Sequence, residues 1–340
     1  AQLAIALIAR DPSELRTLAQ SAAGQLEREK DPSDRSAGRV FFSRDPLGPK
    51  GELAFVYPGS GSQYAGMGRE LCLQWPDVLR AQDHTNERLR SQLKVSEMWE
   101  SASDTGSART VILSQVTLGT ITTDLMVGFG VRPQAVVGYS LGETAGLFSF
   151  GAWHERDEML RRVTESELFV SELTGRCNAA RRTWGVAEDA AVEWSVGVVQ
   201  TPTDRAREVI AELDRVYLLI INTPDECVIG GDASAVQRAV EMLGCPFHAL
   251  GGVPTVHCEV ASAVAEAYRN LHVLDTRPPE DTRFYSGAWG EAYEVDQDRA
   301  ADSLLAQAIQ GVDFPKTVRQ AYDDGVRIFL EMGPGGSCAR

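Results

Sequence analysis

Short apolar runs alternate with longer amphipathic segments along most of the chain. The runs at residues 53–59 and 134–138 are almost wholly apolar, and each leads into a turn that contains glycine. Residues 110–131 are mostly apolar and end beside a glycine, which predicts a long buried helix. Buried apolar strands that alternate with helices are typical of parallel sheets with helices on both faces. The pattern therefore predicts an α/β fold.

The segment from residue 194 to residue 250 has a different order of elements. Its sequence predicts strand, helix, strand, strand, helix and strand, with a tight turn between the two central strands. This order is the ferredoxin-like pattern. Gly251 and Gly252 follow it directly and are a candidate hinge back to the main domain.

The N-terminal region is a third part of the chain. Residues 3–9 predict a strand, and Asp11 and Pro12 begin a helix with apolar residues at helical spacing. Residues 31–51 are polar and contain proline and glycine, as a linker does. The predicted domains are an N-terminal α/β linker at 1–51, a large subdomain at 52–189 and 252–340, and a small subdomain at 190–251.

Composition excludes several classes of protein. The chain has 340 residues and a formal net charge of −15, whereas a general nucleic-acid-binding protein needs a basic surface. Its six cysteines are scattered without a CxxC pair, so we expect a reduced cytoplasmic protein without a disulfide scaffold or a zinc site. The apolar run at residues 3–9 is too short to span a bilayer. We therefore expect no nucleic acid, no membrane and no metal ion as partners.

Ser140 lies in the pattern G-x-S-x-G, between Gly138 and Gly142. In a tight turn from a strand to a helix, flanking glycines avoid steric clashes and the serine hydroxyl is exposed at the helix N-terminus. Backbone N–H groups there, including that of Leu141, can stabilise a developing oxyanion. A serine that merely caps a helix would show the same motif, but here an apolar strand precedes it and a helical pattern follows. This context favours Ser140 as a nucleophile.

A nucleophilic serine needs a base, and His257 is the candidate among the five histidines. The other four occupy positions typical of surface or packed side chains. His257 follows a short extended segment and precedes a predicted helix over residues 259–271. A helix N-terminus disfavours the imidazolium, so it should lower the pKa of His257 and keep the ring neutral, as a general base requires. A purely structural histidine is the open alternative.

A second glycine-rich turn, YPGSGSQYAGMG at residues 57–68, also follows a predicted strand. A dinucleotide-binding pattern that starts at Gly59 would need a small residue where Tyr64 stands, and no GK[ST] follows. Phosphate binding is therefore disfavoured. We expect this turn to lie close to Ser140 and to provide a second backbone N–H group for the oxyanion.

The chain contains five motifs in an order that resembles the acyltransferase domains of fatty acid and polyketide synthases, which are related to malonyl-CoA:acyl carrier protein transacylases. These motifs are YPGSGSQYAGMGREL, GYSLGE, INTPDECVIGGD, VPTVHC and FLEMGPGGSC. Further segments, among them DTRFYSG and VDFPKTV, are most similar to polyunsaturated fatty acid and heterocyst-glycolipid-type synthases. The resemblance implies an α/β-hydrolase-like large subdomain with an inserted ferredoxin-like small subdomain, preceded by a linker.

The resemblance also implies roles for individual residues. Ser140 would carry the acyl group, and His257 would be its base. The N–H groups of Ser60 and Leu141 would form the oxyanion hole, although Ser60 stands where the family usually has glutamine. A backbone carbonyl near Asp313 would orient His257 in place of a triad carboxylate. The predicted substrate contacts are Gln63, Tyr139, Glu165 and Asn222, with Tyr139 in place of the usual histidine.

One further departure concerns the acyl group. Malonyl-type members hold the free carboxylate of their substrate with an arginine about 25 residues after the nucleophile, in a bidentate pair. Here Glu165 stands at that distance from Ser140, and it would repel a dicarboxylate. Arg161 and Arg162 lie almost one helical turn away, so a substitute arginine and a solvated helix face are both open.

The leading hypothesis is a serine-dependent acyltransferase in a synthase for polyunsaturated fatty acids, working beside neighbouring synthase domains. It would move an uncharged acyl group, rather than malonyl, from acyl-CoA or acyl-ACP to Ser140 and on to the phosphopantetheine thiol of an acyl carrier protein. No bound cofactor is expected, because the substrates themselves carry CoA or phosphopantetheine. Candidate carrier-docking residues are Arg176, Arg181 and Arg182, with a solvated loop as the alternative.

Two other functions stay open. A thioesterase or hydrolase would form the same acyl-serine and resolve it with water, and the sequence does not separate transfer from hydrolysis. A docking module with a degenerate site is the non-enzymatic alternative. The presence of both Ser140 and His257 disfavours a degenerate site.

Overall fold

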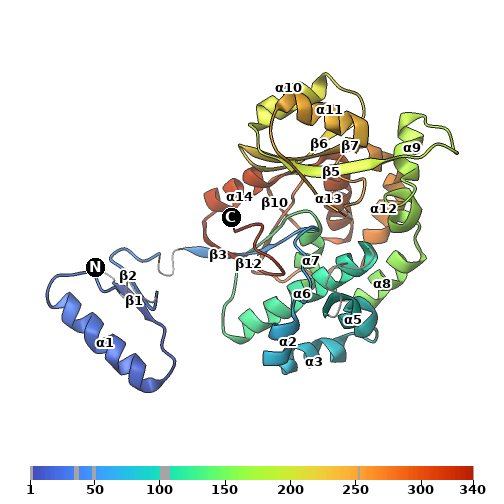
Figure 1. Cartoon of the computed structure of the whole chain (residues 1–340). Coiled ribbons are helices and arrows are strands. Elements are labelled where there is room, and N and C mark those ends of the chain that lie inside the picture. Colours follow the sequence, from blue (N-terminus) through green and yellow to red (C-terminus); the bar gives the residue numbers. More distant parts are fainter. Residues whose placement is uncertain (1–2, 34–37, 48–50, 100–107, 252, 340) are drawn as a thin grey trace. The chain divides into compact units, whose positions relative to one another are not determined.

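The structure is a computed structural model that describes residues 3–33, 38–47, 51–99, 108–251 and 253–339. The chain divides into two compact units, one over residues 1–51 and one over residues 52–340 (Figure 1). The second unit contains both glycine-rich turns and all predicted site residues.

The first unit is a helix and a two-stranded antiparallel ribbon. Strand β1 (Ala4–Leu7) pairs with β2 (Val40–Ser43), and helix α1 (Pro12–Leu26) lies between them in sequence. The Asp11 carboxylate accepts hydrogen bonds from the N–H groups of Ser13 and Glu14, which caps α1 at its predicted start. The prediction of a plain linker over residues 31–51 was wrong for β2, where Val40, Phe41 and Phe42 are strand-forming residues that complete the ribbon.

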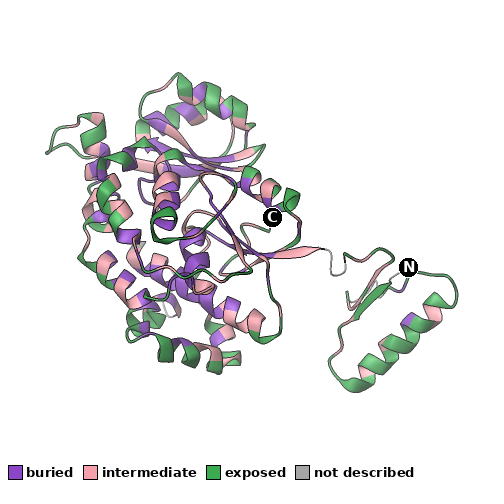
Figure 2. Cartoon of the chain, turned by 180° about the vertical axis from the view of Figure 1, so that it is seen from behind, coloured by how far each residue is buried: buried purple, intermediate pink, exposed green. Residues whose placement is uncertain are grey.

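The core of the second unit is a five-stranded sheet in the order β10-β9-β4-β3-β12. Its strands β3, β4, β9 and β12 are parallel, and only the edge strand β10 is antiparallel. The central strands are buried, which explains their continuous apolar sequences (Figure 2). The strand bounds are β3 Glu52–Tyr57, β4 Ala135–Gly138, β9 Arg283–Tyr285, β10 Ala292–Tyr293 and β12 Val326–Glu331.

Helices pack around this sheet and complete the large subdomain. Between β3 and β4 the chain forms α2 Arg69–Gln74, α3 Pro76–Thr85, α4 Leu89–Gln92, α5 Val95–Trp99 and α6 Ala108–Gly128. After β4 come α7 Leu141–Ser149, α8 Arg156–Glu165, the π-helix η2 Leu168–Glu172 and α9 Asn178–Trp184. The remaining helices are the 3-10 helix η3 Glu259–Val264, α12 Ala265–His272, α13 Gln297–Gln310 and α14 Phe314–Asp323.

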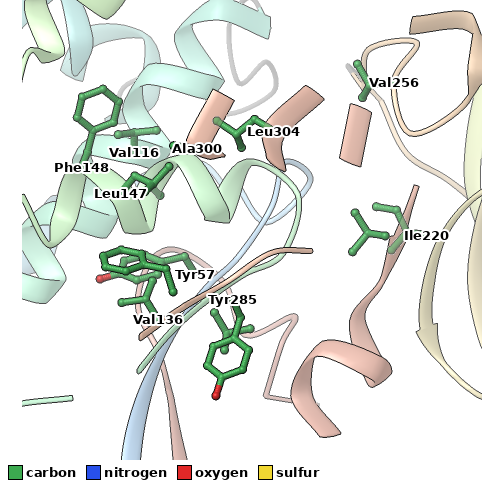
Figure 3. Packing of buried hydrophobic residues seen from close by; sticks show 14 of the residues in the cluster. Tyr57, Val116, Val136, Leu147, Phe148, Ile220, Val256, Tyr285, Ala300 and Leu304 are labelled. Atoms are coloured by element: carbon green, nitrogen blue, oxygen red, sulfur yellow. The ribbon is translucent and has the colours of Figure 1, made fainter. Parts of the chain in front are cut away.

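Helix α6 is the long apolar helix that the sequence predicts. By length and composition it is long enough to cross a bilayer, but 61% of its most apolar window is buried inside the unit. Figure 3 shows Val116 of α6 packed beside Phe148 of α7, and both belong to the main hydrophobic core. Its burial is that of a core helix.

The small subdomain has the predicted order of strands and helices. Its antiparallel strands lie in the order β6-β7-β5-β8, with α10 and α11 packed on them. The bounds are β5 Trp194–Val199, α10 Thr203–Ala211, β6 Val216–Thr223, β7 Glu226–Asp232, α11 Ala233–Leu243 and β8 Phe247–Ala249. The ferredoxin-like prediction is therefore confirmed. Of the predicted hinge, Gly252 lies outside the described residues.

A short strand joins the two subdomains. Strand β11 (Val312–Asp313) follows α13 of the large subdomain and pairs in parallel with Ile220 and Ile221 of β6. The sheet of the small subdomain thus gains a fifth strand that the sequence did not predict, because two residues give no periodic signal.

Candidate active site

The turn after β4 presents Ser140 in a strained backbone conformation. Ser140 has φ 55° and ψ −119°, and α7 begins at the next residue. A Cβ at Gly138 would lie 2.1 Å from the Glu143 nitrogen, and one at Gly142 would lie 1.9 Å from the Tyr57 carbonyl oxygen. Only glycine fits at either position, so the motif that flags Ser140 also determines its geometry.

Ser140 and His257 form a hydrogen-bonded dyad. Ser140 Oγ lies 2.7 Å from His257 Nε2, and His257 Nδ1 lies 2.8 Å from the carbonyl oxygen of Gln307. Because a carbonyl only accepts, Nδ1 carries the proton and Nε2 has the lone pair that accepts from the serine hydroxyl. The dyad predicted from sequence is therefore brought together with the polarity that general-base catalysis needs.

The orienting carbonyl belongs to Gln307, and the prediction of Asp313 was wrong. The Asp313 carbonyl accepts from Thr317 Oγ1 at 3.1 Å, and the Asp313 carboxylate caps α14 through the Lys316 N–H. Gln307 lies in the last turn of α13, and its carbonyl oxygen also accepts from the N–H of Gly311 at 3.2 Å. The same carbonyl oxygen is therefore shared between the C-cap of α13 and His257.

His257 is buried, and burial lowers its pKa to about 4, against the smaller upward effect of the Gln307 carbonyl. The predicted direction agrees, but the predicted cause was wrong. The residues that follow form the short 3-10 helix η3 instead of the start of an α-helix, and desolvation is the dominant effect. The ring is neutral at physiological pH in either case.

Ser60 and Leu141, the two predicted oxyanion-hole residues, line the same cavity as Ser140. Leu141 is the first residue of α7, so its N–H has no partner within the helix. A Cβ at Gly59 would lie 2.6 Å from the Tyr139 ring, so this glycine lets the second turn approach the nucleophile closely. The hydrogen bonds of both N–H groups to an oxyanion stay a prediction.

Tyr139 is the predicted substrate contact that lines the cavity. Its hydroxyl donates to Asn222 Oδ1 at 2.7 Å, and Asn222 Nδ2 donates to Glu226 at 2.9 Å. Asn222 does not line the cavity itself. Its hydrogen bond holds the hydroxyl of Tyr139, whose side chain does line the cavity. Gln63 also lies outside the lining, because its side chain accepts from the Gly61 N–H at 2.7 Å and holds the turn.

Glu165 does not face the cavity, and its prediction as a substrate contact was wrong. Its side chain is 62% exposed and pairs with Arg161, which also pairs with Glu158. The cavity-facing residue of this turn is Val163, two positions earlier and therefore on almost the opposite face of the helix. Arg162 pairs with Glu158 and donates to the Val273 carbonyl at 2.8 Å, so neither arginine is a substitute.

Glu143 is a buried acid that the sequence analysis missed. It accepts from the Gly287 N–H at 3.0 Å, from Gln307 Nε2 at 3.4 Å and from Ser303. Burial raises its pKa to about 7. Glu143 connects the first turn of α7 to α13, which carries the carbonyl on His257. Its position directly after Gly142 in the motif was the available signal.

Arg156 is a second buried residue that the sequence analysis missed. It lines the cavity and is 7% exposed. Its guanidinium donates to Gln82 Oε1 and Thr117 Oγ1, each at 2.5 Å. The signal was present, because Arg156 shares the buried helical face with Met159, Leu160 and Val163.

The predicted carrier-docking arginines lie around α9. Arg182 pairs with Glu172, and Arg181 donates to Asn178 and to the Ala190 carbonyl, while Arg176 is exposed. Among the described residues, no group of three His, Cys, Asp or Glu side chains is placed to hold a metal ion. The six cysteines, all in the described part of the chain, are free thiols.

Comparison with known proteins gives a consistent result. Residues 54–334 match the family described as the acyl transferase domain. Malonyl CoA-acyl carrier protein transacylase of Bacillus subtilis is 26% identical over 301 residues, which are 84% of this chain and 87% of that protein. One of the polyunsaturated fatty acid synthase polypeptides of Thraustochytrium sp. is 24% identical over 326 residues, which are 86% of this chain but only 16% of that polypeptide.

Solved structures show the same architecture. The acyltransferase domain from the second module of the salinomycin polyketide synthase has a TM-score of 0.73 at 22% identity, over 99% of this chain and 74% of that one. An acyl carrier protein S-malonyltransferase from Vibrio cholerae has a TM-score of 0.66 at 22% identity, over 85% of this chain and 92% of that one. The predicted fold class is confirmed.

Proposed function

Because this chain belongs to the acyl transferase domain family, we propose that it transfers an uncharged acyl group from a thioester, through an ester on Ser140, to the phosphopantetheine thiol of a carrier protein. The observation that carries the proposal is the dyad. Ser140 Oγ is 2.7 Å from a buried neutral imidazole whose other nitrogen is fixed by a carbonyl.

The reaction follows from the positions of these atoms. Ser140 Oγ attacks the thioester carbonyl carbon while its proton passes to His257 Nε2, and the carbonyl electrons move onto the oxygen. The N–H groups of Leu141 and Ser60 stabilise this oxyanion. The intermediate collapses, the C–S bond breaks, and the departing sulfur takes the proton from His257.

The second half repeats these steps in reverse. His257 takes the proton of the carrier thiol, and the sulfur attacks the carbonyl carbon of the ester on Ser140. The C–O bond then breaks, and Ser140 Oγ recovers the proton from His257. No other reactant is consumed, so the donor thiol and the acyl-carrier thioester are the only products.

The cavity lining supports an uncharged acyl group. Most of the residues that line the cavity are apolar, among them Phe169, Leu250 and Val253. In the described lining the only guanidinium is that of Arg156, at the buried end. A malonyl carboxylate held near Ser140 would therefore be desolvated without a cation beside it. The expected exclusion of malonyl therefore depends on the apolar residues of the cavity wall, because Glu165 lies outside the cavity.

The synthase context and the partners are part of the proposal. The synthase polypeptide and the transacylase are similar to this chain at nearly equal identity, so the comparisons support the family more than the product. The resemblance of the motifs favours a synthase for polyunsaturated fatty acids, with acyl-CoA or acyl-carrier protein as donor. The acyl carrier protein and neighbouring synthase domains would be its partners.

Intact-protein mass spectrometry with a panel of acyl-CoAs tests the proposal. We expect the acyl mass on wild-type protein and not on Ser140→Ala, followed by transfer to a holo-carrier protein and not to its apo form. Preferential labelling by malonyl-CoA would overturn the specificity. Absence of any label on Ser140 would overturn the mechanism, and release of free acid in preference to acyl-carrier would assign hydrolysis instead.

A further inference from the structure

The cavity at the dyad extends deep into the large subdomain. Its mouth is formed by the half-buried residues Ser60, Tyr139, Ser140 and Leu141 together with His257. Its far end, here called the floor, is formed by residues of α6, α7 and α8 that are at most 8% exposed, namely Leu113, Val116, Phe148, Arg156 and Met159. Five of the cavity-lining residues are labelled in Figure 3, namely Val116, Phe148, Leu304, Ile220 and Val256. These buried side chains bound the cavity at the floor.

The length of the cavity follows from α7, which runs beside it. Thr144 and Phe148 of this helix both line the cavity, so it follows the helix away from Ser140. Phe148 is eight residues after Ser140, which corresponds to about 12 Å along a helix. An extended chain advances about 3.5 Å for every three bonds, so about ten bonds cover this distance.

Arg156 closes the floor with a charged network. Its hydrogen bonds to Gln82 and Thr117 join α8 to α3 and α6. Beside it, Gln92 donates to Asp157 at 2.7 Å. A longer chain would have to break buried charge-assisted hydrogen bonds to pass this point, which is costly.

From this geometry we propose that the cavity is an acyl tunnel, which holds an uncharged acyl chain of about ten carbons on Ser140 with its methyl end against Arg156. The inference rests on the proposed function, since it takes Ser140 as the acyl carrier. It adds chain length as the property that this site selects. Malonyl or acetyl would leave most of the tunnel empty, and each methylene added within the tunnel buries further apolar surface.

The length dependence of Ser140 acylation tests the tunnel. Wild-type protein is incubated with straight-chain acyl-CoAs from acetyl to palmitoyl, and the initial rate of ester formation is followed by intact mass. We expect kcat/KM to rise by roughly threefold to fourfold per methylene up to octanoyl or decanoyl and to fall at palmitoyl. A steady decline from acetyl, or a rate for palmitoyl equal to that for decanoyl, would overturn the proposal.

A pair of variants on α6 tests the location. Val116→Phe adds a ring at the floor, and Val111→Phe adds the same ring to the same helix outside the cavity lining. We expect Val116→Phe to slow decanoyl transfer at least tenfold while acetyl transfer stays within about twofold, and Val111→Phe to leave the preference unchanged. Equal effects of Val116→Phe on both chains would contradict the proposal.

Loss of folding, loss of ester formation and loss of chain-length preference give different results. If Val116→Phe shows no cooperative thermal transition, Val163→Phe takes its place, because the added ring fills the tunnel from α8. The same result is expected for it, namely slower decanoyl transfer and unchanged acetyl transfer. Loss of ester formation with every acyl-CoA in the wild type defeats the proposed function. Ester formation without length preference defeats the acyl tunnel alone.

Discussion

At the mouth of the acyl tunnel, Ser140 and His257 both have positive φ, 55° and 68°. At the floor, Val116, Phe148 and Met159 lie in regular helices and meet only through side-chain packing. The mouth places individual atoms, and it holds them in conformations that cost of order 1–3 kcal/mol each. The side chains of the floor determine the shape of the far end of the tunnel, and they come from the three helices α6, α7 and α8. Changes at the mouth should therefore abolish the reaction, whereas changes at the floor should redirect it.

The largest expected effect comes from exchanging two similar histidines. His257 and His272 are both buried, both bond a backbone carbonyl through Nδ1 at 2.8 Å, and burial lowers the pKa of each to about 4. Only His257 faces Ser140. His257→Asn should slow ester formation from acetyl-CoA by roughly 10²–10⁴-fold, since the base is lost.

His272→Asn is the matched control, because His272 lines the tunnel away from the serine. Its rate with acetyl-CoA should stay within about threefold of wild type, whatever its loss of thermal stability. Equal losses in the two variants would break the distinction between mouth and floor.

A second expected effect concerns the backbone of the mouth. Gly142→Ala would place a Cβ 1.9 Å from the Tyr57 carbonyl oxygen, so β3 and α7 must separate. We expect a loss of roughly 3 kcal/mol in the free energy of unfolding, with little ester formed. Gly128→Ala at the end of α6 meets no atom within 4 Å and should raise stability by up to about 1 kcal/mol. Denaturant titration of both variants measures the contrast, and similar losses would refute it.

A third expectation concerns pH. The folded pKa of His257 is lowered from 6.5 to about 4, so the neutral base persists as the pH falls and is lost only near pH 4. The rate constant for Ser140 acylation should therefore stay level where a histidine of ordinary pKa would already lose about tenfold per pH unit. Single-turnover rates across the acid range measure this, and a midpoint near 6.5 would show that the ring is solvated.

The same shift has a consequence for stability. Between pH 4 and 6.5 the unfolded chain binds more protons at His257 and His272 than the native protein does. The contribution of the two histidines to stability therefore increases as pH rises through this window and is lost as pH falls.

The smallest expected effect lies outside the cavity. Glu165 is exposed and paired with Arg161, so Glu165→Gln should leave every acyl-CoA rate within about twofold. Glu165→Arg should likewise fail to increase malonyl labelling. A marked gain of malonyl transfer in Glu165→Arg would place this side chain at the mouth. It would contradict the observed orientation of α8, in which position 165 faces solvent and Val163 faces the cavity.

Sequence predicted the mouth well because one short motif contains the glycines on which its geometry depends. Gly138 is required by a contact with Glu143 inside the turn, and Gly142 is required by the close approach of α7 to Tyr57 of β3. The carbonyl that orients His257 could not be predicted in this way, since any side chain can carry it. Gln307 has this role because α13 ends there, and the position of a helix end relative to a distant histidine is a tertiary property.

The floor was beyond the sequence analysis for a different reason. Counting residues from Ser140 reached Glu165, but the count does not give the rotational phase of α8, which turns Val163 inward. The fold class and the ferredoxin-like insertion were predictable from the periods of long segments. The short strands β2 and β11 were not, because they form only where a partner strand is available.

The two-residue strand β11 connects the surroundings of the catalytic base to the small subdomain. It follows α13 directly through Gly311, where a Cβ would lie 2.7 Å from the Leu219 carbonyl oxygen and 3.3 Å from that of His257. The backbone at His257, the end of α13 and Leu219 of β6 thus meet at one glycine. The small subdomain therefore belongs to the scaffold that holds the catalytic base, although no atom of it takes part in the reaction.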